Sequence, residues 1–156
     1  IKEGVLKMNI SEVLKKENIV LGVSAKNKTD AIEKMIAVLY SGGTLTDKTA
    51  FTEDVMARER VSSTGIGNGI AIPHGKSPNV RETAVAVARL TDTIDWGGED
   101  SEPVKFIVLL AVNENDKGNT HVKILSQMAR KLASPQTCER LMNASGADEI
   151  VDIFSE

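Results

Sequence analysis

The sequence predicts an α/β protein: a single domain in which a mixed β-sheet is flanked by helices on both faces, as an α/β/α sandwich. Two nearly continuous apolar runs, Thr83–Leu90 and Val104–Val112, indicate strands that are covered on both faces. Amphipathic helical patterns with capping residues lie before and after these runs. The length of 156 residues suits one domain that can bury a substantial core.

Two helices are expected in the first part of the chain. Asn27 begins a helical pattern whose apolar stripe ends at Gly42 and Gly43. Asp47 can cap a second helix, which runs to about Arg60. The expected order therefore has helices first and last, with the strands between them.

Short strands and further helices complete this order. A short strand is predicted at Ile70–Ile72, because the residue before Pro73 is biased toward extended geometry. Another short strand is expected over Thr93–Trp96, between the two long ones. Three helices should follow the last strand: one from Asn119 or Thr120, one from Ser134-Pro135 through Leu141, and one over Asp148–Phe154.

Composition narrows the class of protein. The formal net charge of −3 and the pI near 5.5 do not match a nucleic-acid partner. Cys138 is the single cysteine, which excludes an intramolecular disulfide and favours a reducing compartment. Apolar runs such as Phe106–Val112 fall short of the ~20 residues of a membrane span. We expect a cytoplasmic protein without direct membrane insertion, with residues 1–7 as an N-terminal extension.

The stretch TGIGNGIAIPHGK, residues 64–76, places His74 directly after a proline. The fixed φ of Pro73 and the extended bias of Ile72 restrict the chain that leads to this imidazole. Gly75 leaves room beside it for the backbone of another molecule or for a phosphate. Taken alone, His74 also fits an ordinary surface-loop histidine that follows an edge strand.

Two further polar residues extend apolar helical stripes. Arg58 follows Phe51 and Val55 at helical spacing, near the end of its helix. His121 continues the apolar stripe of the next long helix within its first turn. Each also suits a structural role, as a snorkelling arginine or as a histidine at the core edge. If both approach His74, the three side chains form a basic pocket.

Such a pocket suits phosphoryl chemistry better than the other kinds of site. The chain has no His-x-x-x-His or Cys-x-x-Cys pair for a metal and no G-x-S-x-G serine elbow. Its glycines lead into a strand, whereas a dinucleotide fingerprint opens a helix. A phosphoryl group needs a nucleophile such as His74, counter-charges such as Arg58 and a second imidazole, and donors. Those donors are the Thr64 hydroxyl and glycine amides, including Gly65 and Gly67.

The combination of these motifs resembles a known family. The stretch at residues 64–76 is preceded by Met-Ala-Arg-Glu at 56–59 and followed far downstream by Asn-Thr-His at 119–121. This pattern is similar to the fructose/mannitol-type enzyme IIA domain of the bacterial phosphoenolpyruvate-dependent sugar phosphotransferase system. The similarity begins near Met8, so residues 8–156 are expected to form that domain, an α/β sandwich with a mixed sheet.

The resemblance implies roles for individual residues. His74 would be the phosphorylated nucleophile, which takes the group from the histidine of an HPr-type phosphocarrier and passes it to a cysteine of an enzyme IIB domain. The family uses Nε2, and a backbone carbonyl on Nδ1 would leave that nitrogen free. Arg58 would bind phosphate and His121 would be the second active-site histidine. The assigned supporting residues are Thr64, Gly65, Gly67, Asn68 and Glu59. Such a carrier needs no metal or organic cofactor.

Two functions stay open at this point: a sugar-transport carrier, or a regulatory domain whose phosphorylation state controls partner binding. Gly75-Lys76 stands between the Ala-Lys frequent in the first group and the Gly-Arg frequent in the second. Either role requires a docking surface around His74. We expect an apolar patch with a polar rim, formed by Ile66, Ile70 and the segment near Gly75.

Overall fold

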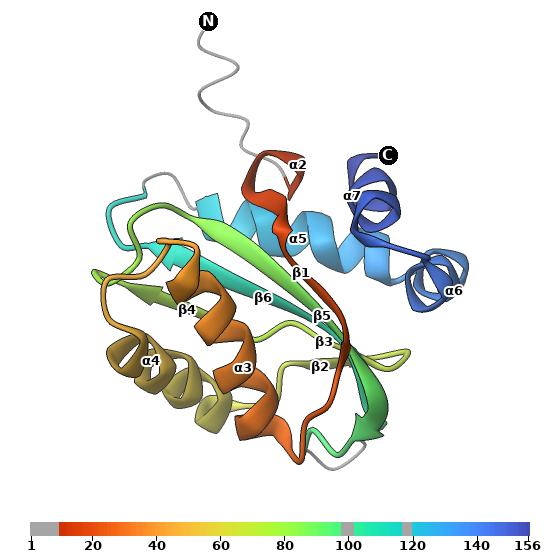
Figure 1. The fold of residues 1–156 in the computed structure, drawn as a ribbon, viewed down its shortest axis with the longest axis horizontal. Helices are drawn as coiled ribbons and strands as arrows, with labels where there is room; N and C mark the ends of the chain where they lie inside the picture. The colour runs from red at the N-terminus through yellow and green to blue at the C-terminus, as the bar shows by residue number, and fades with distance from the viewer. Residues whose placement is uncertain (1–9, 98–101, 117–119) are drawn as a thin grey trace, which may run out of the picture.

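The computed structural model describes residues 10–97, 102–116 and 120–156, which form an α/β/α sandwich (Figure 1). The expected extension at residues 1–7 lies outside the described residues. The elements, in chain order, are α2 (Ile10–Val13), β1 (Leu14–Val23), α3 (Lys28–Ser41), α4 (Lys48–Val61), β2 (Gly65–Gly67), β3 (Ile70–Ala71), β4 (His74–Ser77), β5 (Ala84–Ile94), β6 (Val104–Asn113), α5 (Thr120–Leu132), α6 (Pro135–Asn143) and α7 (Ala147–Ser155).

The described strands form one six-stranded mixed sheet, which confirms the predicted sheet type. Its order is β1-β5-β6-β3-β2, and β4 also pairs with β6. β1 runs parallel to β5, and β3 and β4 run parallel to β6, whereas β5 and β6 are antiparallel. β3 and β4 therefore follow one another along a single edge of β6, and the chain between them contains Pro73.

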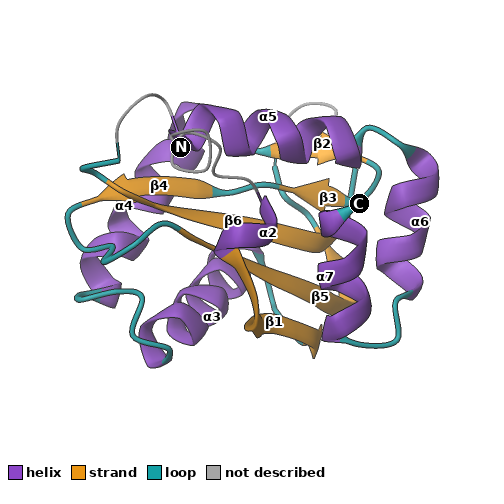
Figure 2. Cartoon of the chain, turned by 90° about the horizontal axis from the view of Figure 1, so that it is seen from above, coloured by secondary structure: helices purple, strands orange, loops and turns teal. Residues whose placement is uncertain are grey.

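Helices cover both faces of this sheet, as predicted. α3 and α4 lie on one face, and α5, α6 and α7 lie on the other with α2 (Figures 1 and 2). Each face has its own apolar core: Phe51 and Trp96 belong to the first, Leu110 and Met128 to the second. No helix in the described part of the chain is long and apolar enough to cross a bilayer.

Three predicted helix starts are confirmed by their caps. The side chains of Asn27, Asp47 and Ser134 each accept a hydrogen bond from the backbone amide three residues later, at 2.9, 3.0 and 3.3 Å. These bonds satisfy amides that have no partner within the helix. Each capping side chain lies next to the helix that it caps in the sequence. The helix starts could therefore be predicted from the local sequence alone.

Two parts of the predicted order are wrong. β1 precedes α3, so the strands do not all follow the first long helices. Its residues 15–17 are charged and exposed, which hides the apolar alternation of this edge strand. Thr93–Trp96 is not a separate strand, because β5 continues through Ile94 and Trp96 lies beyond its end in the core.

Candidate functional site

His74 is the first residue of β4 and is half-buried. Its Nδ1 lies 3.0 Å from the carbonyl oxygen of Ile72. A carbonyl oxygen can only accept a hydrogen bond, so the proton of the neutral ring sits on Nδ1 and donates to Ile72. The lone pair is then on Nε2, which points away from this bond. The expected contact between Nδ1 and a backbone carbonyl is present.

The register of β4 determines which way His74 faces. His74 pairs with Leu110, whose side chain lies in the core beneath α5, α6 and α7, whereas Gly75 pairs with Ala111, which faces α3 and α4. A Cβ atom on Gly75 would lie 3.0 Å from Cγ2 of Val55 on α4. β4 therefore packs on α4 through a glycine and turns the imidazole toward the opposite face of the sheet.

His121 is the second residue of α5, a helix that begins above β4 in the view of Figure 2. Its pKa is lowered from the usual 6.5, first by burial and then by the charges of Lys76 and His74. The charge of His74 is thus among the causes that lower the pKa of His121. Burial and like charge both keep the His121 imidazole neutral near pH 7. Sequence reasoning gave Lys76 no role at the site, because it did not predict the strand β4, in which residues two apart face the same side.

Arg58 lies near the end of α4, on the layer opposite to α5. The core stripe of α4 consists of Phe51, Val55 and Glu59, and Arg58 is only half-buried beside it. Its Nη1 donates to the carbonyl oxygen of Ser62 at 2.9 Å. The guanidinium is thereby held on the segment that leads into β2, and is directed to this carbonyl.

Glu59 and Thr64 bond to each other in a buried network. The Thr64 hydroxyl donates to the Glu59 carboxylate and accepts from Nε1 of Trp96 at 3.2 Å. Lys28, at the start of α3, pairs with Glu59 at 2.9 Å and lies 5.4 Å from the centre of the Trp96 ring. The Thr64 carbonyl accepts the amide of Ile72 at 3.0 Å, so the network anchors the chain beside the strand that leads to His74.

With this geometry established, comparisons identify the family. The family model "Phosphoenolpyruvate-dependent sugar phosphotransferase system, EIIA 2" matches residues 12–156. The chain belongs to this EIIA family. A mannitol-specific phosphotransferase enzyme IIA component from Staphylococcus aureus is 33% identical over 94% of this chain and 98% of its own length.

Two further relatives differ in organisation and in the function that their names state. The fructose-specific EIIABC component from Bacillus subtilis is 37% identical over 96% of this EIIA chain, which spans only 23% of that protein. The nitrogen regulatory protein IIA-Ntr from Neisseria meningitidis has a crystal structure that matches with a TM-score of 0.85 and 32% identity, over 93% of this chain and 98% of its own. The relatives thus include both transport and regulatory proteins.

The glycine-rich segment of this EIIA chain is a β-hairpin. β2 pairs antiparallel with β3, and Asn68 and Gly69 form the turn between them with φ values of 58° and 78°. Positive φ at both central residues is the geometry that Asn-Gly favours in tight hairpins. Gly67, with φ of 92°, precedes the turn, and Gly65 pairs with Ala71. The expected supporting residues in this segment therefore shape the hairpin that leads to His74.

The expected docking surface is only partly right. Ile66 is 45% exposed, but Ile70 is fully buried because β3 lies between β2 and β6, and Gly75 is buried against α4. Val122, next to His121, and Val61, at the end of α4, are exposed instead. Together with Ile66 and with Tyr40 on α3, these are the exposed large apolar side chains of the described residues.

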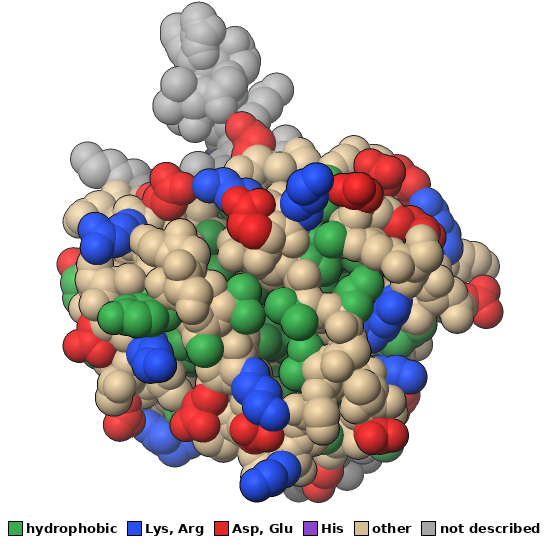
Figure 3. Space-filling model, in the orientation of Figure 1, with side chains coloured by type: hydrophobic (Ala, Val, Ile, Leu, Met, Phe, Trp, Pro, Cys, Tyr) green, Lys and Arg blue, Asp and Glu red, His purple; other side chains and the backbone are tan. Residues whose placement is uncertain are grey.

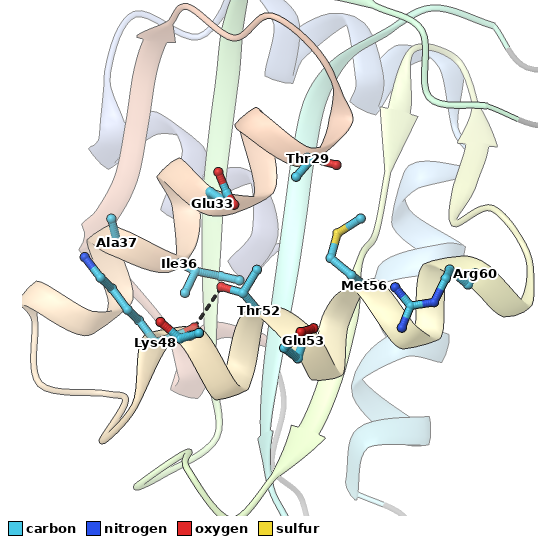
Figure 4. A pocket seen from close by; sticks show the side chains of 10 residues that line it. Thr29, Glu33, Ile36, Ala37, Lys48, Thr52, Glu53, Met56 and Arg60 are labelled. Carbon is cyan, nitrogen blue, oxygen red and sulfur yellow. Dashed lines mark hydrogen bonds between the residues drawn. The ribbon is translucent and has the colours of Figure 1, made fainter.

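Several hollows among the described residues lie apart from the histidines, and two of them adjoin α3. A cleft of about 500 Å³ between α3 and α4 is lined by both acidic and basic side chains, including Glu33, Glu53, Lys48 and Arg60 (Figure 4). An apolar groove of about 230 Å³ lies where α3 meets β1 and β5, and hydrophobic side chains are visible near the middle of this face (Figure 3). Neither hollow is lined by His74 or His121.

Proposed function

We propose that this EIIA chain is a phosphocarrier that takes a phosphoryl group on Nε2 of His74 from an HPr-type protein and passes it to a cysteine of an enzyme IIB domain. The observation that supports this most strongly is the hydrogen bond from Nδ1 to the carbonyl of Ile72. It places the lone pair on the nitrogen that is free to attack. Residues 8–156 form the carrier domain in this proposal, and its location is cytoplasmic.

The transfer consists of two in-line displacements at phosphorus. Nε2 of His74 attacks the phosphorus, the N–P bond of the donor histidine breaks, and its electron pair returns to the donor ring. The cysteine thiolate of the acceptor then attacks, and the second N–P bond returns its pair to Nε2. Catalysis of such a step depends on positioning and on charge stabilisation of the phosphoryl oxygens.

The surroundings of His74 support this role. His121 has a lowered pKa and is neutral near pH 7, so its ring can donate an N–H to a phosphoryl oxygen without a permanent charge. The first turn of α5 adds the partial positive charge of a helix N-terminus. Arg58 uses one of its five N–H donors on the Ser62 carbonyl, so its guanidinium can bind a phosphoryl oxygen through another donor, and we assign it this role.

The runner-up function is a regulatory EIIA domain. The similarity to nitrogen regulatory protein IIA-Ntr, at 32% identity over nearly the whole of both chains, favours it. Against it, the EIIABC relative shares 37% identity and carries enzyme IIB in its name. Both functions use the same histidine chemistry and differ in the acceptor.

The test is phosphorylation with phosphoenolpyruvate, enzyme I and HPr, followed by intact mass and then by addition of an enzyme IIB domain. His74→Ala should take up no phosphate. His121→Ala should be phosphorylated but transfer about a hundredfold more slowly, since loss of one oxyanion donor costs about 3 kcal/mol. Acid-labile phosphate on the His74→Ala protein would overturn the assignment. Phosphorylation without any transfer to enzyme IIB domains would favour the regulatory function.

A further inference from the structure

We infer that Lys76 is a phosphate-binding residue of this site, whose ammonium group pairs with the phosphoryl oxygens while the group is on His74. This inference rests on the proposed function and adds a residue that the resemblance did not supply. It also predicts that the site binds free inorganic phosphate, which can be measured without any partner protein.

The strand geometry places Lys76 on the histidine face. His74 and Lys76 are two residues apart in β4, so their side chains project to the same side of the sheet, about 7 Å apart along the strand. Their partners in β6, Leu110 and Val112, both belong to the core beneath α5. Lys76 is exposed, and a long flexible stem lets its ammonium group reach a ligand on the neighbouring imidazole.

Among the described residues, no carboxylate forms an ion pair with Lys76. The ion pairs among the described residues join Lys15, Lys16, Lys28, Lys34 and Arg140 to carboxylates, and none of them includes Lys76. Its charge reaches His121, where it helps to lower the pKa of that ring. In the part of the chain that the structure describes, a cation and two imidazoles are thus brought together, and no ion pair neutralises the cation. An anion with several oxygens satisfies this arrangement.

Arg58 does not already fill this role. Its guanidinium donates to Ser62 from the α4 layer, whereas Lys76 stands on the same strand and face as His74. Lys76 therefore binds the phosphoryl group from the face of β4 that carries His74, a position that Arg58 on α4 does not share.

The experiment compares Lys76→Met, which keeps the stem and removes the charge, with Lys76→Arg and with the control Lys16→Met. Lys16→Met changes the net charge by the same amount as Lys76→Met. It does so far from His74, because Lys16 lies on β1 at the opposite edge of the sheet. Titration with inorganic phosphate, followed by the NMR signals of both histidine rings, should show an affinity about tenfold lower for Lys76→Met. Lys76→Arg should retain most of it, and Lys16→Met all of it. The pKa of His121 should rise in Lys76→Met alone.

The same variants are then phosphorylated by phospho-HPr, where Lys76→Met should accept the group about tenfold more slowly. If the wild-type protein accepts no phosphoryl group from phospho-HPr, the proposed function fails. The titration with inorganic phosphate still tests whether Lys76 binds phosphate. Wild-type phosphorylation with unchanged phosphate affinity and rate in Lys76→Met would overturn the inference. Equal losses in Lys76→Met and Lys16→Met would also overturn it, because they would reflect net charge only.

Discussion

Replacing Gly75 by alanine should move β4 away from α4 and destabilise the protein. The added methyl carbon would lie 3.0 Å from Cγ2 of Val55 and 3.2 Å from Cε1 of Phe51, both of which are fully buried. Gly75 is not among the glycines with positive φ, so alanine is compatible with its backbone conformation. The cost is therefore steric, and it falls on the strand that carries His74.

Two opposing effects determine how much Gly75→Ala changes the free energy of unfolding. Insertion of a methyl group into a packed core typically costs about 1–3 kcal/mol. Glycine-to-alanine replacement restricts the unfolded chain and returns about 0.4–1 kcal/mol. The steric effect is expected to be larger because Val55 and Phe51 are both fully buried and packed in the core. We expect Gly75→Ala to lower the free energy of unfolding by about 1–2 kcal/mol. For a domain of this size, Tm should fall by roughly 2–4 °C for each kcal/mol lost.

Urea unfolding followed by tryptophan fluorescence measures this, because Trp96 is the single tryptophan and is fully buried. Gly42→Ala is the matched control: its φ is −82° and the nearest atom to the new methyl lies at 3.5 Å, so it should be neutral or slightly stabilising. Val55→Ala should relieve the clash, giving a favourable coupling energy in the double variant. Equal stability of Gly75→Ala and wild type would refute the packing argument.

Two further predictions concern ionisable groups. Because the pKa of folded His121 lies below 6.5, the unfolded chain binds this proton first on acidification. Stability should therefore fall as the pH drops through 6.5, and His121→Gln should remove this part of the slope in unfolding midpoints between pH 8 and 5. Lys28→Met should cost about 3 kcal/mol, since it leaves the buried Glu59 carboxylate without its counter-charge. The double variant Lys28→Met/Glu59→Gln should recover part of that loss, and a full additive loss would contradict the pairing.

The predicted α/β/α sandwich is confirmed because its signals are local. The caps at Asn27, Asp47 and Ser134 and the apolar runs of β5 and β6 each operate within a few residues. The same locality explains the errors. β1 is an edge strand with exposed charges at residues 15–17, so its alternation is weak, and only its pairing with β5 reveals it.

The sequence by itself determined how His74 is presented: Pro73 and Gly75 flank it, and Nδ1 meets the carbonyl of Ile72 two residues earlier. Only the tertiary structure decided which distant side chains surround it. The pairing of β4 with β6 turns the face that His74 and Lys76 share toward α5, where their charges reach His121. The physical reason is that an apolar stripe on a helix, or a two-residue spacing in a strand, specifies only which residues share one face of that element. Which faces meet depends on the packing of the whole sheet.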